Sequence, residues 1–189
     1  MVKVHPWRNC LAIVMSFALG ACSPMAGLEP LPVSASTQYL LDAGDELRVT
    51  AYGLDGFSST YVISDMGTVS LPLIGDVPAS GKTADQVQQA IARQLTERRI
   101  VNAPIVNVQV NEYRHFFVVG EVKKPGEYPF RPGTSVLNAI SMAGGYTFRA
   151  QTKKVAIIRR QANGSFTAVA TEQSLIQPGD TIRVYESWF

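Results

Sequence analysis

Two short helical segments, each set among strand segments, constrain what this 189-residue chain can fold into. The first begins at Thr83, which stands three residues before Gln86 in the spacing of a capping box. The second begins at Thr134 and ends at Gly144-Gly145, because glycine just past a helix end accommodates the turn. Apolar stripes at helical spacing comprise Val87, Ala90, Ile91 and Leu95 in the first segment and Val136, Leu137, Ile140 and Ala143 in the second. The chain therefore divides into two units with one helix each.

Strands with alternating apolar and polar residues surround the first helix. The predicted strands are Glu46–Tyr52, Tyr61–Ser64, Thr68–Ile74 and Val106–Asn111. Pro72 lies inside the third of these, which indicates an edge strand or a bulge. These elements predict a first domain over residues 38–113.

The second helix is surrounded by strands in the same way. The predicted strands are Phe116–Val122, Glu127–Phe130, Lys154–Arg160, Phe166–Ala170 and Asp180–Tyr185, with a hairpin turn at Asn163-Gly164. They predict a second domain over residues 114–189, built as a small sheet with one helix. The fold class is therefore α+β, with two small mixed strand and helix domains.

Short turns separate these elements, and we predict a structural role for the residues that form them. Gly44-Asp45 and Gly179-Asp180 each lead into an alternating strand, so the two segments are a weak internal echo. The echo is also explained by the suitability of Gly-Asp for any tight turn. The predicted turn residues are Gly44, Asp45, Gly67, Gly75, Gly120, Pro125, Gly126, Gly144, Gly145, Gly179 and Asp180.

The first 21 residues have the layout of a bacterial secretory signal peptide. Lys3 and Arg8 precede an apolar run at residues 10–19, which is half the roughly 20 residues that a membrane-spanning helix needs. The run leads into Leu19-Gly20-Ala21-Cys22, which resembles the lipobox of bacterial lipoproteins. That resemblance implies that Cys22 carries the lipid anchor. The alternative is a plain signal peptide, which would leave Cys22 as a free thiol.

Residues 22–37 contain several proline, serine and alanine residues and are predicted to form a flexible tether. The lipoprotein resemblance also implies a location, because Ser23 after the cysteine favours the outer membrane in enteric-type sorting. We therefore expect a protein of a Gram-negative bacterium, lipid-anchored at the periplasmic face of the outer membrane.

Charge and cysteine content exclude several classes of function. Without Lys3 and Arg8, the 17 basic residues fall to 15 and equal the 15 acidic residues. A nucleic-acid-binding protein needs a basic surplus, so nucleic acid is not an expected partner. Cys10 and Cys22 are too few for a cysteine zinc site or a disulfide framework.

No motif in the sequence selects an enzyme. The segment 80–83 precedes a helix, but Asp76 occupies the position where a phosphate-binding loop has its first glycine. No nucleophile elbow occurs. His115 is the one histidine after the predicted signal peptide, and we expect it at the domain junction, paired with a backbone carbonyl. We predict no catalytic residue, no metal site and no cofactor.

The order of these segments resembles the outer-membrane polysaccharide export family, the Wza-like auxiliary proteins. The resemblance to its export domain rests on Tyr39–Leu47, Met66–Gly75, the helix from Thr83 and the strand Ala103–Val108. The resemblance to a soluble-ligand-binding β-grasp (SLBB) domain rests on Val118–Tyr128, Ala143–Gly145 and Pro178–Asp180. Together the two matches cover residues 38–186.

This resemblance implies a homo-oligomeric ring that passes capsule polysaccharide or exopolysaccharide, without enzymatic activity. It implies an inner-membrane polysaccharide co-polymerase as a partner. One departure is that the best-known members carry a C-terminal transmembrane helix, whereas no segment after residue 22 is apolar enough to span a bilayer. Either a separate outer-membrane β-barrel therefore supplies the pore and is a further expected partner, or the ring only gates another conduit. The alternative function is a monomeric lipoprotein module that binds a soluble small ligand or glycan.

We predict that Cys22→Ser abolishes membrane association, because the acyl chains on Cys22 would supply the anchor and each buried methylene contributes about 0.8 kcal/mol. Fractionation of cells that produce the variant should find it in the soluble periplasmic fraction. A variant that stays in the membrane pellet with no partner holding it there contradicts the lipoprotein interpretation.

Overall fold

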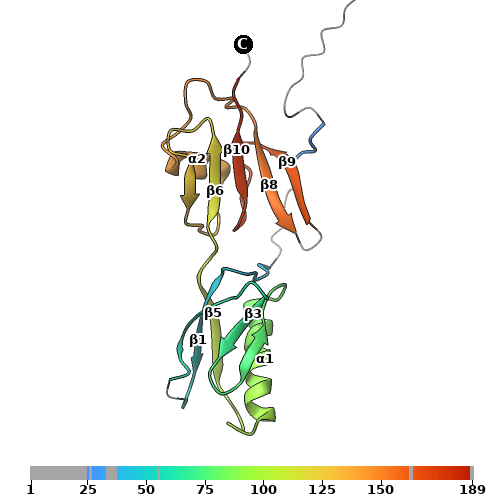
Figure 1. The fold of residues 1–189 in the computed structure, drawn as a ribbon, viewed down its shortest axis with the longest axis vertical. Coiled ribbons are helices and arrows are strands. Elements are labelled where there is room, and N and C mark those ends of the chain that lie inside the picture. The colour runs from blue at the N-terminus through green and yellow to red at the C-terminus, as the bar shows by residue number, and fades with distance from the viewer. Residues whose placement is uncertain (1–24, 26, 33–37, 55, 162–163, 188–189) are drawn as a thin grey trace, which may run out of the picture.

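The computed structural model describes residues 25, 27–32, 38–54, 56–161 and 164–187. They form two domains that lie end to end along a rod (Figure 1). We call β1 to β5 with α1 the first domain and β6 to β10 with α2 the second domain. Each has its own cluster of buried apolar side chains. The α+β class predicted from the sequence is confirmed.

The first domain is built on an antiparallel sheet of three strands in the order β2-β1-β5. These strands are β1 (Glu46–Ala51), β2 (Ser59–Val62) and β5 (Val106–Glu112). Leu47 and Val49 are fully buried on the inner face of β1, as the alternating pattern predicts. The alternation in β5 likewise buries Val106 and Val108.

A separate hairpin, β3 (Thr68–Leu71) with β4 (Gly75–Pro78), completes the strands of this domain. The sequence predicted one strand through Ile74, and this prediction is wrong. The strand ends before Pro72 because proline has no N–H to donate to the pairing, and Leu73 then adopts a left-handed φ of 65° in the turn.

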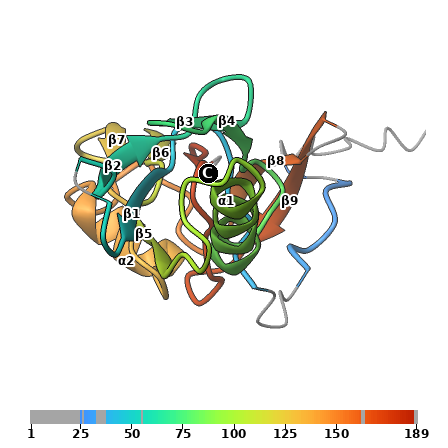
Figure 2. The ribbon, with the colours of Figure 1, turned by 90° about the horizontal axis from the view of Figure 1, so that it is seen from below.

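Helix α1 (Ala84–Glu97) covers this sheet and hairpin. The predicted capping box is present, since the N–H of Gln86 donates to Thr83 Oγ1 over 3.3 Å and the N–H of Thr83 donates to Gln86 Oε1 over 3.0 Å. Viewed from below, α1 has the hairpin on one side and the three-stranded sheet on another (Figure 2). Its stripe of Val87, Ile91 and Leu95 is fully buried in that space.

The second domain has a five-stranded sheet in the order β7-β6-β10-β8-β9, with α2 (Val136–Met142) packed on one face (Figure 1). The central strand β10 runs parallel to β6 and antiparallel to β8. The strands are β6 (Phe116–Gly120), β7 (Gly126–Tyr128), β8 (Val155–Gln161), β9 (Gly164–Ala170) and β10 (Thr181–Val184).

Helix α2 begins one residue later than predicted. Its N-cap is Ser135, whose hydroxyl accepts from the N–H of Asn138 over 3.3 Å while Asn138 Oδ1 accepts from the N–H of Ser135 over 3.1 Å. The Thr134 hydroxyl instead donates to the carbonyl of Arg131 over 2.6 Å. The adjacent hydroxyl residues both resemble a cap in sequence, and only the one with a reciprocal partner three residues later serves as one.

Part of the segment predicted to be a flexible tether lies along the edge strand β9. The N–H of Leu31 donates to the carbonyl of Val169 over 2.7 Å, and the N–H of Val169 donates to the carbonyl of Glu29 over 2.8 Å. Leu31 packs on the core of the second domain, and Met25 is 7% exposed. An edge strand offers unpaired N–H and carbonyl groups, which explains why residues 29–31 pair there.

No helix within the described ranges is long and apolar enough to cross a membrane. The predicted signal peptide and Cys22 lie outside the described residues.

Most of the predicted turn glycines have a left-handed backbone. A positive φ is found at Gly44, Gly67, Gly75, Gly120, Gly144, Gly145 and Gly179, but not at Gly126. The most constrained is Gly120, at the end of β6, where φ is 93°. A Cβ built there would lie 2.0 Å from the carbonyl oxygen of Val184 in the neighbouring strand.

We predict that Gly120→Ala lowers the free energy of unfolding by at least about 2 kcal/mol, because it adds a strained φ and a backbone clash. Urea unfolding measures the change. Gly126→Ala is the matched control, since its backbone is unstrained and a Cβ there meets no atom within 4 Å. Equal stability of Gly120→Ala and wild type would refute this assignment.

Candidate functional site at the domain junction

The two echoing Gly-Asp turns meet where the domains join. In the first turn, Asp45 accepts the N–H of Asp42 at Oδ2 over 2.9 Å. In the second, Asp180 accepts the N–H of Gln177 at Oδ2 over 2.7 Å. Both aspartates are fully buried. The echo therefore corresponds to a repeated local structure, in which a buried carboxylate closes the turn that starts a strand.

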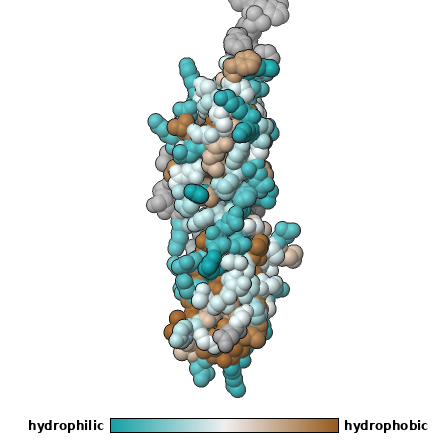
Figure 3. Space-filling model, turned by 90° about the vertical axis from the view of Figure 1, so that its left-hand side faces the viewer, coloured by the Kyte–Doolittle hydropathy of each residue, from teal (hydrophilic) through white to brown (hydrophobic). Residues whose placement is uncertain are grey.

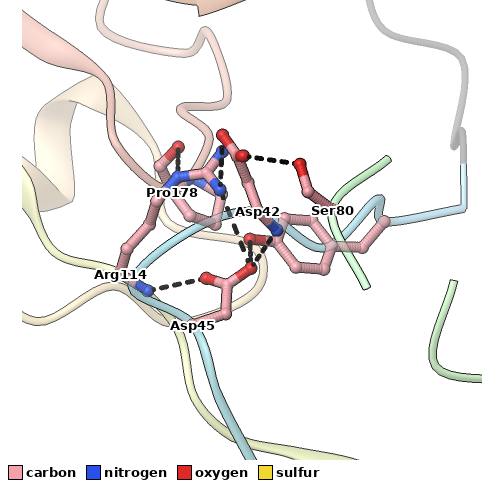
Figure 4. Close-up of polar contacts among 6 residues, drawn as sticks. Asp42, Asp45, Ser80, Arg114 and Pro178 are labelled. Carbon is pink, nitrogen blue, oxygen red and sulfur yellow. Dashed lines mark hydrogen bonds and ion pairs between the residues drawn. The ribbon is translucent and has the colours of Figure 1, made fainter. Parts of the chain in front are cut away.

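Arg114, between β5 and β6, joins the two turns (Figure 4). Its N–H donates to Asp45 Oδ1 over 3.0 Å, and its Nε donates to the carbonyl of Pro178 over 3.2 Å. Its Nη1 lies 3.2 Å from Asp42 Oδ2 and 3.7 Å from Asp45 Oδ2. One residue of the connecting segment therefore holds the first-domain turn through its charge and the second-domain turn through a hydrogen bond.

Gly179 allows the arginine to come this close. A Cβ built at Gly179 would lie 2.7 Å from Arg114 Nε, nearer than two such atoms can approach, and φ at this position is 80°. The glycine of the second turn is thus required both by the turn and by the approach of Arg114.

The buried Asp45 carboxylate has a further donor in Tyr39. The phenol O–H donates to Asp45 Oδ2 over 2.6 Å. Burial of the ring, together with this hydrogen bond to a carboxylate, raises the pKa of Tyr39 well above its ordinary value. Tyr39 therefore stays protonated and keeps donating to Asp45 throughout the physiological pH range.

The Asp180 carboxylate is matched by an arginine of its own domain. Arg159 on β8 donates from Nε to Oδ1 over 2.9 Å and from Nη2 to Oδ2 over 2.7 Å, and its side chain is 7% exposed. Such a bidentate ion pair gives each oxygen of the buried carboxylate a hydrogen-bond donor.

Aromatic rings cross the junction beside these polar contacts. Tyr39 and Tyr113 meet edge to face with their centroids 5.0 Å apart, and Tyr113 meets Phe130 of the second domain edge to face at 5.6 Å. Edge-to-face pairs of this kind contribute about 0.5–1.5 kcal/mol each beyond their buried area.

His115 lies at the junction, but its expected carbonyl partner is wrong. Its Nδ1 is 3.0 Å from Glu127 Oε1 on β7, and its Nε2 is 3.2 Å from Glu112 Oε1 at the end of β5. The imidazole therefore bridges carboxylates from the two domains. Local sequence could not reveal this, because Glu127 reaches His115 only through the pairing of β6 with β7.

A cleft of about 190 Å³ opens at this junction. Its walls come from both domains, and its lining residues are Asp42, Ala43, Arg114, His115, Phe117, Glu127, Arg160, Pro178 and Gly179. Among the described residues, no group of three or more His, Cys, Asp or Glu side chains converges as a metal site. The arrangement offers polar side chains and one aromatic ring at the surface.

The structure brings four of the predicted turn residues to this junction, namely Gly44, Asp45, Gly179 and Asp180. The others lie elsewhere, with Gly67 and Gly75 at the β3–β4 hairpin, Gly120, Pro125 and Gly126 around the β6–β7 turn, and Gly144 and Gly145 after α2. Sequence reasoning missed Tyr39, Arg114 and Arg159. The adjacency of Arg114 to the predicted domain boundary was a usable signal.

Comparison with known families divides the chain at this junction. Residues 33–111 match the family model described as a polysaccharide biosynthesis/export protein. Residues 115–170 match the SLBB domain. The connecting residues 112–114, which include Arg114, lie between the two matched ranges.

The chain is also similar to named proteins. It is 36% identical over 124 residues to an exopolysaccharide production protein, ExoF, of Rhizobium meliloti (strain 1021), covering 60% of this chain and 30% of that protein. It is 29% identical over 152 residues to an EPS I polysaccharide export outer membrane protein, EpsA, of Ralstonia nicotianae, covering 75% of this chain and 39% of that protein.

A third relative is a capsule polysaccharide export outer membrane protein, CtrA, of Neisseria meningitidis serogroup B. It is 29% identical over 130 residues, which cover 64% of this chain and 32% of that protein. The chain thus spans between 30% and 39% of the length of these three curated relatives.

We predict that Tyr39→Phe lowers the free energy of unfolding by about 1.5–3 kcal/mol at pH 7, because a buried carboxylate loses one hydrogen-bond donor. Above pH 10 the unfolded chain ionises Tyr39 while the folded protein does not, since folding raises the pKa of this phenol. Wild type then loses stability that the variant cannot lose, so the gap between the two narrows as the pH rises.

Urea unfolding between pH 7 and pH 11 measures this gap. Tyr52→Phe is the matched control, because Tyr52 is 82% exposed at the far end of β1. A Tyr39→Phe gap that stays flat or widens above pH 10 contradicts the predicted role of the phenol.

Proposed function

Because the chain belongs to the outer-membrane polysaccharide export family, with an export domain followed by an SLBB domain, we propose that it is a component of a capsule or exopolysaccharide export channel. Copies of the chain form a ring at the periplasmic face of the outer membrane, and polysaccharide passes through it. The observation that carries this proposal is the order of the two matched domains in one chain. The relatives named for polysaccharide production or export support the same substrate class.

The path of the N-terminal segment supports an orientation at the membrane. Met25 is buried, and Leu31 packs against the core of the second domain. Cys22 precedes Met25 by three residues, which span at most about 11 Å when fully extended. A lipid on Cys22 therefore holds the packed segment at the membrane and leaves the first domain to project into the periplasm.

The far end of the first domain supports a partner on the periplasmic side. Apolar side chains gather over this end of the rod (Figure 3). Tyr52, Leu73 and Ile105 are 82%, 61% and 70% exposed. The N–H of Tyr52 donates to the carbonyl of Ile105, so these two lie together. Exposed apolar groups that cluster in this way are typical of protein contacts, and an inner-membrane polysaccharide co-polymerase is the partner we propose.

The chemistry of the junction supports transport without catalysis. The two buried aspartates are each held by an arginine and backbone N–H groups. Both oxygens of each carboxylate already accept hydrogen bonds within the protein, and both side chains are fully buried, so neither is presented to a substrate. A conduit acts instead through its shape, its assembly from several copies of the chain and weak polar contacts with the polysaccharide.

The experiment that tests the proposal is removal of the chain from its own bacterium. The deletion strain should lose surface polysaccharide, and the wild-type gene should restore it. Chemical cross-linking in intact membranes should give species larger than a dimer. Normal surface polysaccharide in the deletion strain contradicts the export role, and a species that stays monomeric in cross-linked membranes favours the monomeric binding module.

We predict that His115→Gln retains polysaccharide secretion within a few-fold of wild type. Glutamine keeps hydrogen-bonding capacity toward Glu112 or Glu127, and the expected loss is on the order of one hydrogen bond, about 1 kcal/mol. Secretion is measured as surface polysaccharide per cell. A fall of several orders of magnitude, with the variant folded and membrane-bound, contradicts transport without acid–base chemistry.

A further inference from the structure

The junction cleft combines features that suit one sugar ring. Its volume of about 190 Å³ is below the roughly 300–1,000 Å³ of a pocket for a drug-sized ligand. We therefore expect it to take up one sugar ring, with the rest of a bound oligosaccharide lying outside the cleft. Because the walls come from both domains, neither family match alone contains the whole cleft.

An aromatic ring forms one wall. Phe117 on β6 is 41% exposed, while its neighbours Phe116 and Val118 are fully buried under α2. Alternation along the strand therefore places Phe117 on the sheet face that α2 does not cover. A large apolar ring at a polar cleft offers a flat surface to the C–H face of a pyranose.

Polar side chains flank this ring on the same face. Strand pairing sets Glu127 directly beside Phe117, and β8 carries Arg160 two residues after Ile158, which lies opposite Thr181. Both Glu127 and Arg160 line the cleft. A carboxylate accepts hydrogen bonds from sugar hydroxyls, and a guanidinium donates them.

The charged side chains that line the cleft differ in whether another side chain already pairs with them. Asp42 is engaged by Arg114 and by the Ser80 hydroxyl, which donates over 2.9 Å, and Glu127 is engaged by His115. Within the described residues, by contrast, no acidic side chain pairs with Arg160. Arg160 is therefore the charged side chain of the cleft that is left free for a ligand, and a guanidinium binds a carboxylate through two parallel hydrogen bonds.

We propose that this cleft is a binding site for one sugar unit that carries a carboxylate, with the ring stacked on Phe117 and the carboxylate on Arg160. The site rests on the proposed export function, since it makes the junction a contact point for an acidic polysaccharide as it passes. It also gives the junction a role in recognising the exported chain.

Titration of the full-length protein in detergent tests the site, with tetragalacturonic acid and neutral maltotetraose as probes. Calorimetry or ligand-observed NMR measures binding. Tetragalacturonic acid should bind more tightly than maltotetraose. Phe117→Ala and Arg160→Gln should each weaken its binding at least fivefold.

The matched controls are Phe148→Ala and Arg93→Gln, because Phe148 is 93% exposed on the loop after α2 and Arg93 is exposed on α1. Neither residue lines the cleft, so both variants should bind as wild type does. Circular dichroism should show each variant folded.

Three results overturn the site: no binding of either probe, binding that both cleft variants retain, or equal binding of the two probes with no effect of Arg160→Gln. The deletion strain separates these failures from failure of the export role. If the gene restores surface polysaccharide while no probe binds, the sugar site falls and the export proposal stands. If deletion leaves surface polysaccharide unchanged, the export proposal falls whatever the titration shows.

Discussion

The buried carboxylate of Asp45 is the constraint on which the junction depends. A carboxylate removed from water costs several kcal/mol unless donors surround it. Here the donors are the phenol of Tyr39, the N–H of Asp42 and the N–H of Arg114, with the Arg114 guanidinium nearby. They come from segments 69 residues apart. The carboxylate is therefore satisfied only when the start of β1 and the connection between the domains lie together.

The second domain repeats this arrangement at its own central strand. Asp180 is fully buried at the start of β10 and is held by Arg159 and the N–H of Gln177. Arg114 then joins the two turns, since its Nε reaches the carbonyl of Pro178. Arg114, in the segment that connects the domains, therefore takes part in the hydrogen bonds of both turns. In the export ring that we propose, this connection would hold the two domains of each protomer in a fixed direction and preserve the shape of the cleft between them.

Local features of the structure could be predicted from the sequence because local chemistry determines them. The capping box of α1 needs only Thr83 and Gln86, and the alternation in β1 and β5 follows from one buried face. Residue type alone did not show that β3 ends before Pro72 or that Ser135, and not Thr134, is the N-cap of α2. Both outcomes depend on which neighbouring groups form hydrogen bonds. The pairing of residues 29–31 with β9 and the position of Arg114 depend on partners far along the chain, for which a single sequence carries no local signal.

The distance between the domains tests the rigidity of the junction most directly. Pulsed electron–electron double resonance measures this distance between two spin labels. The labels are attached at the exposed positions Gln89→Cys in α1 and Thr167→Cys in β9. Wild type should give a single narrow distribution of distances, no broader than that of two labels placed within one domain. Arg114→Ala should broaden this distribution. A broad distribution in wild type, or an unchanged narrow one in Arg114→Ala, would contradict a junction held by the contacts of Arg114 with both turns.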